Sequence, residues 1–296
     1  MENVLTLIGA AGVALEDDLV ADVRAALKGL GADVGMPDWL SPGRVADLKF
    51  GHLAPEQADA AARQRLADLK VDVVAQKAEG RRKQLLVADM DSTMVIGETL
   101  DELAEYAGIK DKIAAITARA MNGELVFEDA LRERIGLLDG LPESALAETW
   151  ERTQLMPGAV QLVRTMKANG AYAVLVSGGF TYFTARVREA CGFDVDLGNR
   201  FIFKKGKLAG VEDPILGRET KLSTLIGTAG ERQIPLSLAV AVGDGANDLD
   251  MIRAAGLGVA YHAKPVVAAE ARVRVDHGDL TVLLYAQGYR DEEFVG

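Results

Sequence analysis

The chain has 296 residues, 49% of them hydrophobic, which suits a globular protein with enough length for one large core or two domains. Its 44 acidic side chains outnumber 33 basic ones, and the net charge of -11 argues against nucleic acid or an anionic membrane as a partner. Because no apolar run approaches the roughly 20 residues that span a bilayer and the start is not basic, we expect a cytoplasmic enzyme without a membrane partner.

The first eighty residues alternate short apolar strands with two amphipathic helices. We expect strand 4–8, helix 15–30, strands 32–40 and 45–50, helix 55–69 and strand 71–76. This order is the ferredoxin-like arrangement of a small α+β domain. A charged, glycine-containing segment at 77–83 follows, so we expect one domain over 1–80 and a second over 81–296.

The second domain alternates strands with helices, which predicts an α/β fold built on a doubly wound parallel sheet. Strands are expected at 85–88, 173–176, 238–242 and 259–260, with a hairpin at 200–208. The segment 98–153 has a helical pattern and no strand signal, so we expect a helical cap insert that closes over the site as a lid. Gly97 and residues 153–158 would be its hinges.

Two aspartates, Asp89 and Asp91, directly follow the strand 85–88. Alternate residues of a strand point the same way, so both carboxylates could be aimed at one spot. Such like charges are tolerated when a divalent cation neutralises them, or when one carboxylate attacks while the other carries a proton. A solvated turn explains this segment equally well, so the other strand ends have to decide.

Further polar groups follow the next strands of the predicted sheet. Ser177-Gly178-Gly179 offers a hydroxyl and close backbone approach, which suit an anion, although a plain tight turn competes. Asp244 could join Asp89 around a cation that prefers oxygen ligands. Lys221 would supply the fixed positive charge that an acidic, phosphate-binding site needs, although most lysines are simply solvated.

In order along the chain, these groups resemble the motifs of a known family. They are Asp89-Met90-Asp91-Ser92-Thr93, Ser177-Gly178-Gly179-Phe180, Lys221 and Gly243-Asp244-Gly245-Ala246-Asn247-Asp248. The set is similar to that of the haloacid dehalogenase (HAD) superfamily, specifically its phosphoserine phosphatases, over the second domain. The second aspartate favours members that transfer phosphate over dehalogenases.

The resemblance implies Mg²⁺-dependent hydrolysis of O-phospho-L-serine, the last step of serine biosynthesis. It makes Asp89 the nucleophile that takes the phosphoryl group, and Asp91 the acid that protonates the leaving alkoxide and then activates water. The resemblance also implies that Ser177, Gly178 and Lys221 hold the phosphoryl oxygens. Mg²⁺ would be bound by the carboxylates of Asp89 and Asp244 and by the backbone carbonyl of Asp91. Asp248 would orient these ligands without binding the ion itself.

The resemblance also implies positions that recognise the substrate. Glu98 suits its ammonium group, Arg134 its carboxylate, and Phe127 would close the pocket above it. Asn247 resembles a family residue near the phosphate, while a helix cap at Asn247 or Asp248 competes with this role. Taken singly, Glu98 and Arg134 would be exposed helix charges and Phe127 a core aromatic.

The first domain resembles the ACT-type modules found on longer phosphoserine phosphatases. This resemblance implies a regulatory or dimerising role, with a homodimer and an amino-acid effector as partners, although a packing module without a ligand is a competing interpretation.

Four other functions compete with phosphoserine hydrolysis: a phosphatase acting on another small phosphomonoester, a phosphotransferase, a phosphoryl-accepting signalling domain, and a non-catalytic amino-acid-binding protein. The last of these, suggested by residues 1–80 alone, leaves the four motifs unexplained. Asp91 and the large insert argue against signalling, which needs neither a leaving-group acid nor a lid. The lone cysteine, Cys191, is expected to be a small buried hydrophobe.

Overall fold

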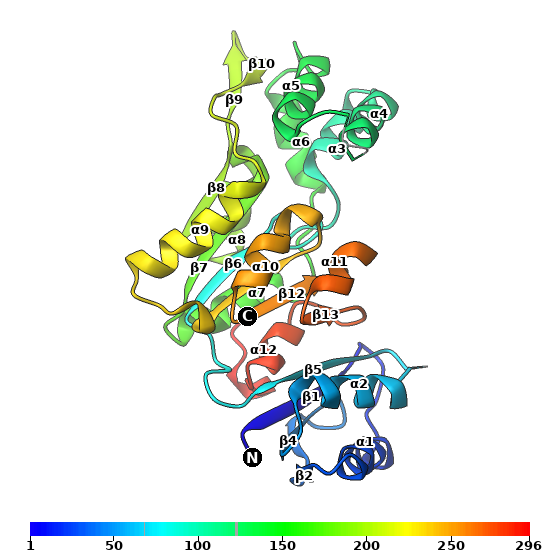
Figure 1. The fold of residues 1–296 in the computed structure, drawn as a ribbon. Coiled ribbons are helices and arrows are strands. Elements are labelled where there is room, and N and C mark those ends of the chain that lie inside the picture. The colour runs from blue at the N-terminus through cyan, green and yellow to red at the C-terminus, as the bar shows by residue number, and fades with distance from the viewer. Residues whose placement is uncertain (68, 122–123) are drawn as a thin grey trace.

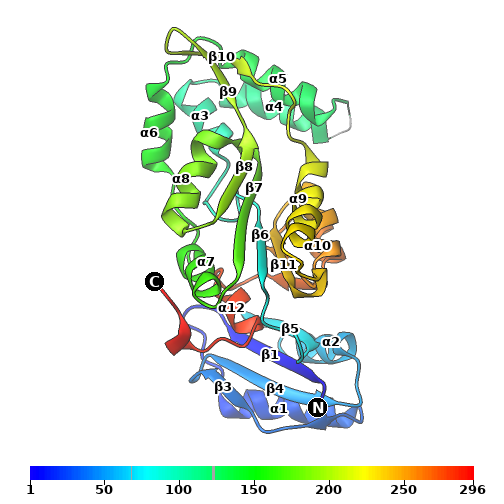
Figure 2. The ribbon, with the colours of Figure 1, turned by 90° about the vertical axis from the view of Figure 1, so that its left-hand side faces the viewer.

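The computed structural model describes residues 1–67, 69–121 and 124–296. Figures 1 and 2 show three regions stacked along one direction, with an antiparallel sheet at one end, a parallel sheet in the middle and a group of helices at the other end. Within the described ranges, no helix combines the length and hydrophobicity that crossing a bilayer requires.

The N-terminal region is the expected ferredoxin-like sheet with two helices. Its elements are β1 (Asn3–Gly9), α1 (Asp17–Gly29), β2 (Asp33–Val34), β3 (Asp38–Ser41), β4 (Val45–Gly51), α2 (Pro55–Arg65) and β5 (Val71–Lys77). The strands run antiparallel in the order β2-β4-β1-β5, with β3 also on β4.

Two of the sequence predictions for this region were wrong in detail. The single strand predicted at 32–40 is divided into β2 and β3, because Pro37 lies between them and has no N–H to continue a ladder. The second helix ends at Arg65 rather than at residue 69; part of that predicted stretch, residue 68, lies outside the described residues.

The middle region is the expected doubly wound parallel sheet. Its strands are β6 (Leu85–Ala88), β7 (Tyr172–Phe180), β8 (Val195–Asn199), β11 (Ala239–Gly243), β12 (Leu257–Tyr261) and β13 (Val273–Val275), in the spatial order β13-β12-β11-β6-β7-β8. All neighbouring pairs are parallel. The sequence patterns did not predict the two edge strands, β8 and β13.

Alternating side chains of the central strands build two hydrophobic layers. Leu86 and Ala88 of β6 face a core that includes α7 (Ala159–Ala168), α8 (Thr181–Cys191) and α12 (Val282–Ala286). Leu85 and Val87 face α9 (Arg218–Glu231) and α10 (Leu249–Ala254) on the other side. This alternation is what a sheet covered on both faces requires. The short helix α11 (Pro265–Glu270) follows β12.

A helical cap lies over the C-terminal ends of the strands (Figure 1). It contains α3 (Thr99–Tyr106), α4 (Lys110–Met121), α5 (Phe127–Leu137) and α6 (Ser144–Arg152). The two segments that connect it to the sheet pair with each other, since the Ile96 N–H donates to the Gln154 carbonyl at 2.8 Å. The predicted hairpin forms as β9 (Phe201–Lys204) and β10 (Lys207–Val211), and Leu208 exchanges backbone hydrogen bonds with the cap residues Gly140 and Leu141.

The N-terminal sheet shares a hydrophobic core with the middle region. One of its faces packs on α1 and α2. On its other face, Ile8, Val45 and Val74 belong to the same buried cluster as Tyr285 and Tyr289 near the C-terminus. Both faces of this small sheet are therefore covered by apolar groups.

A buried carboxylate stabilises the same joint. Asp72 of β5 is 0% exposed and accepts backbone N–H groups of Asp276, His277 and Gly278, at 2.7, 3.3 and 2.7 Å. These three donors follow the edge strand β13 of the parallel sheet. Asp72 thus connects the edges of the two sheets.

We predict that Asp72→Asn lowers the free energy of unfolding by about 2 kcal/mol, because one carboxylate oxygen is replaced by an N–H group that faces other donors. Asp33→Asn, the same change at an exposed position of β2, should change it by less than about 0.5 kcal/mol. Urea unfolding of both variants measures the difference. Equal midpoints would contradict a stabilising role for Asp72.

Candidate active site

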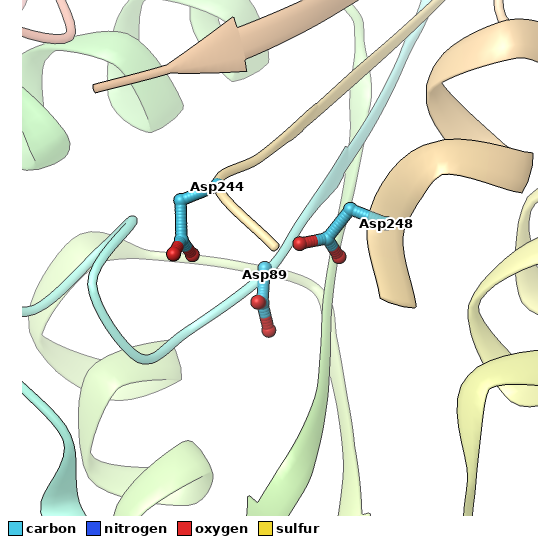
Figure 3. Close-up of side chains that lie close together, drawn as sticks. All are labelled: Asp89, Asp244 and Asp248. Carbon is cyan, nitrogen blue, oxygen red and sulfur yellow. The ribbon is translucent and has the colours of Figure 1, made fainter. Parts of the chain in front are cut away.

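Three acidic side chains converge at the C-terminal edge of the parallel sheet (Figure 3). Asp89 follows β6, Asp244 follows β11, and Asp248 lies one turn further on. Each of them offers a carboxylate oxygen, and these oxygens lie within 4.8 Å of one another. All three residues are buried. Such a group of carboxylates needs positive charge close by.

Lys221, in the first turn of α9, supplies part of this charge. Its Nζ lies 2.8 Å from Oδ2 of Asp89 and 2.6 Å from Oδ1 of Asp248, and the residue is 2% exposed. Burial alone would lower the pKa of Lys221, but the two carboxylates raise it. Burial and the charge of Asp248 raise the pKa of Asp89 well above its usual range, while Lys221 acts in the opposite direction.

Asp91 lies beside this cluster at the base of the cap. Its Oδ1 accepts the backbone N–H of Thr99 at 2.9 Å, at the start of α3. Burial raises the pKa of Asp91, and the hydrogen bond from Thr99 limits the rise. A raised pKa favours a carboxyl group that holds a proton and can donate it.

Residues 177–179, an irregular part of β7 that we call the Ser177 loop, approach the same point. The Gly179 N–H donates to Oγ of Ser177 at 2.8 Å, and Ser177 is buried. A Cβ on Gly179 would lie 2.9 Å from Oδ2 of Asp91, so a larger residue has no room there. The following helix α8 begins only at Thr181. The loop itself, rather than the first turn of that helix, therefore lies at the site.

Asp244 belongs to the same acidic cluster, but the ion pairs of Lys221 are with Asp89 and Asp248. The Thr93 hydroxyl donates to Oδ1 of Asp244 at 3.2 Å. Burial and the charge of Asp248 raise the pKa of Asp244, and Lys264 acts against this rise. Asp248 also accepts the Gly245 N–H at 3.0 Å, so it closes the turn before α10 in addition to binding Lys221.

These residues surround a cavity of about 430 Å³ between the sheet and the cap. Of the site residues predicted from the sequence, all except Asp248 line it: Asp89, Asp91, Glu98, Phe127, Arg134, Ser177, Gly178, Lys221, Asp244 and Asn247. Asp248 lies fully buried behind them.

Other residues of the cavity wall were not predicted. They include the cap residues Leu100, Thr117, Leu125 and Leu131, together with two basic residues, Arg218 at the start of α9 and Lys264 after β12. The topology offered a signal for Lys264, because it follows β12, and the C-terminal strand ends of such a sheet surround the site.

The cap presents two opposite charges and an aromatic ring to the cavity. Glu98 accepts the Ser92 hydroxyl at 3.1 Å, and burial of its carboxylate with the charges of Asp91 and Asp244 raises the pKa of Glu98 to about 7. Arg134 is half-buried, and within the described ranges no carboxylate lies at ion-pair distance from it. Phe127 lies over Gly178, where an added Cβ would be 3.1 Å from the ring.

Comparison with known proteins agrees with this geometry. Residues 86–253 match the model of the haloacid dehalogenase-like hydrolases. A curated phosphoserine phosphatase from Haemophilus influenzae is 42% identical over 220 residues, which cover 73% of this chain and 70% of that protein. The chain belongs to the haloacid dehalogenase-like hydrolase family. Within that family, similar curated proteins from Haemophilus influenzae, Streptomyces coelicolor and Archaeoglobus fulgidus are phosphoserine phosphatases.

Solved structures extend the similarity. A probable phosphoserine phosphatase from Vibrio cholerae is 32% identical with a TM-score of 0.79, covering 97% of this chain and 86% of that one. A phospho-aspartyl intermediate analogue of phosphoserine phosphatase is 38% identical with a TM-score of 0.64, over 69% of this chain and 98% of that one. The chain spans less of some curated relatives, for example 56% of the Streptomyces coelicolor phosphoserine phosphatase.

We predict that Glu98→Gln stabilises the metal-free protein at pH 8 but not at pH 4.5. The pKa of Glu98 rises from 4.5 to about 7 on folding, so the folded state loses stability as the pH rises through this range and the carboxylate ionises. Thermal midpoints at the two pH values measure this effect. Glu151→Gln, an exposed charge of the same cap, is the control, and an equal gain at both pH values in Glu98→Gln would refute the explanation.

Proposed function

We propose that the protein hydrolyses O-phospho-L-serine to L-serine and phosphate, the last step of serine biosynthesis, through a phosphorylated aspartate. One observation supports this proposal above all: Asp89, Asp91, Lys221 and the loop of Ser177 and Gly178 line one cavity. Phosphoryl transfer depends on positioning and on neutralised charge more than on complex proton chemistry. The phosphoserine phosphatases among the relatives support the choice of substrate.

In the first step, a carboxylate oxygen of Asp89 attacks phosphorus and the bond from phosphorus to the serine oxygen breaks. Asp91 gives its proton to the leaving alkoxide, which its raised pKa favours. In the second step, water attacks phosphorus, Asp91 takes a proton from the water, and the bond to Asp89 breaks. Two easier displacements replace one difficult displacement. Ser177, Gly178 and Lys221 hold the phosphoryl oxygens in both.

The acidic cluster fits a divalent cation, which we propose to be Mg²⁺. Lys221 contacts Asp89 and Asp248, whereas the bond that the structure gives the Asp244 carboxylate comes from a neutral hydroxyl, so negative charge is left over. Hard oxygen ligands suit Mg²⁺. Asp89, Asp244 and the Asp91 carbonyl would hold it, with Asp248 orienting them. When bound, the ion neutralises charge that develops on the phosphoryl group.

Specificity for an amino acid follows from the two charges of the cap. Arg134 lies in the cavity wall and forms no ion pair with a carboxylate of the described residues, although the charges of Asp101 and Glu98 act on its pKa. Its guanidinium can therefore bind the substrate carboxylate. Glu98 would accept the substrate ammonium group. Phe127 would close the pocket above the phosphate loop, and Asn247, which is exposed at its rim, would lie near the phosphate.

We propose a regulatory or dimerising role for residues 1–80, with an amino acid as effector. We also propose that the protein is cytoplasmic, since its proposed substrate and product are small soluble metabolites. Ferredoxin-like order supports an ACT-like domain. Because both sheet faces are covered, contacts of this region with a second copy would involve the outer strands β2 and β3 or the helices α1 and α2. Sedimentation of the full chain with and without L-serine tests this role.

The central test is phosphate release from O-phospho-L-serine with Mg²⁺, compared with phosphothreonine, a sugar phosphate and an aryl phosphate. We expect a strong preference for phosphoserine, loss of turnover with EDTA, and loss in Asp89→Asn, which lacks the nucleophile. Equal, poor rates on all substrates would leave the family chemistry standing but refute phosphoserine as the substrate. Transfer of phosphate to an added alcohol would instead indicate a phosphotransferase.

We predict that Arg134→Met lowers kcat/KM for phosphoserine roughly a hundredfold, because a charge-assisted contact to the carboxylate is lost. The value for phosphoethanolamine, which has no carboxylate, should stay nearly unchanged. Arg152→Met at the exposed end of α6 is the matched control. A similar loss for both substrates would assign Arg134 to cap stability instead.

A further inference from the structure

The pairing of β7 with β8 is interrupted at the phosphate-binding loop. Val176 pairs with Leu197 and Phe180 pairs with Asn199, so β7 carries two more residues than β8 between these pairs. Because of the extra residues, Ser177, Gly178 and Gly179 bulge out of the β7–β8 ladder, and bulges of this kind redirect side chains toward functional sites. Residues in a bulge lose some backbone hydrogen bonds to the neighbouring strand, so other contacts have to hold them in place.

The side chain of Asn199 provides this support. It is 2% exposed, and its Nδ2 donates to the carbonyl of Gly178 at 2.8 Å. In a planar trans peptide the C=O and the next N–H point in opposite directions. Fixing the Gly178 carbonyl toward β8 therefore directs the Gly179 N–H away from β8, where it meets Oγ of Ser177 at 2.8 Å.

The other end of the same amide reaches the second half of the phosphoryl site. Oδ1 of Asn199 accepts the Leu216 N–H at 2.7 Å. Leu216 is followed by Gly217 and then by the start of α9, whose first turn carries Lys221. One buried side chain thus joins the loop of Ser177 and Gly178 to the segment that delivers the lysine.

We propose that Asn199 is the positioning residue of the phosphoryl-binding site, which it organises by holding the Gly178 peptide and the Leu216 segment at a fixed separation. The inference rests on the proposed function only for the identity of the anion, since it concerns the phosphate group and not the serine moiety. Asn199 itself does not line the cavity, so it acts through the loop.

The test is Asn199→Asp in the full chain with Mg²⁺. Aspartate keeps an oxygen for the Leu216 N–H, but it turns its other oxygen toward the carbonyls of Gly178 and Leu216. The bonds that Nδ2 donates to these carbonyls, at 2.8 and 3.4 Å, are therefore lost, while the bond from the Leu216 N–H remains. We expect the dissociation constant of inorganic phosphate, measured by calorimetry, to rise about tenfold or more, and kcat for phosphoserine to fall by about tenfold to a hundredfold. Asn199→Gln, with both groups on a longer arm, should recover part of the loss.

The matched control is Asn3→Asp. Asn3 is also buried and donates from Nδ2 to a backbone carbonyl, that of Leu53 at 3.0 Å, but in the N-terminal sheet. It should lower the thermal midpoint while leaving phosphate affinity unchanged. Asn199→Ser, which is neutral and smaller, replaces Asn199→Asp if that variant does not fold, with the same expected loss of affinity.

Unchanged phosphate affinity in a folded Asn199 variant, or an equal loss in Asn3→Asp, would overturn the positioning role. Absence of phosphate binding by the unaltered chain would overturn it too. If the unaltered chain binds phosphate, the Asn199 variants bind it more weakly, and the unaltered chain does not hydrolyse phosphoserine, the proposed function fails while the positioning role holds. The two proposals are therefore tested separately.

Discussion

The site depends on one buried charge arrangement, the bridge of Lys221 between Asp89 and Asp248. A lysine and two carboxylates removed from water cost free energy unless they are paired closely. Lys221 forms ion pairs with Asp89 and Asp248 but not with Asp244, so three carboxylates share one closely paired lysine. The arrangement therefore keeps an acidic cluster in the buried site.

The parallel sheet is what allows this arrangement. Asp89 and Asp244 follow adjacent strands, β6 and β11, and Ser177 lies near the C-terminal end of β7, on the other side of β6. Side chains that are far apart in the chain meet because the ends of parallel strands lie at one edge. The cap then adds Glu98 and Arg134 to the same cavity, so its acidic cluster and its cap charges come from separate layers of the molecule.

Much of this could be predicted from the sequence. The strand 85–88 has the predicted bounds, since an uninterrupted apolar run is strongly bounded by the polar residues that follow it. The edge strand β8 was missed because Gly198 and Asn199 are typical of a turn. Local pattern likewise failed at Pro37, which divides a predicted strand, and at Lys264, whose place in the cavity wall depends on tertiary structure. The site residues that the sequence predicted belong to short motifs at the ends of successive strands. The residues that it did not predict reach the cavity or the sheet edge only through contacts between distant segments.

The joint between the N-terminal sheet and the C-terminal helix α12 has a consequence for synthesis on the ribosome. Ile8, Val45 and Val74 are made long before their apolar partners Tyr285 and Tyr289. Until α12 has been made, this face of the first sheet lacks its apolar partners. Contacts between such distant segments form slowly, and the apolar surface stays exposed until they do.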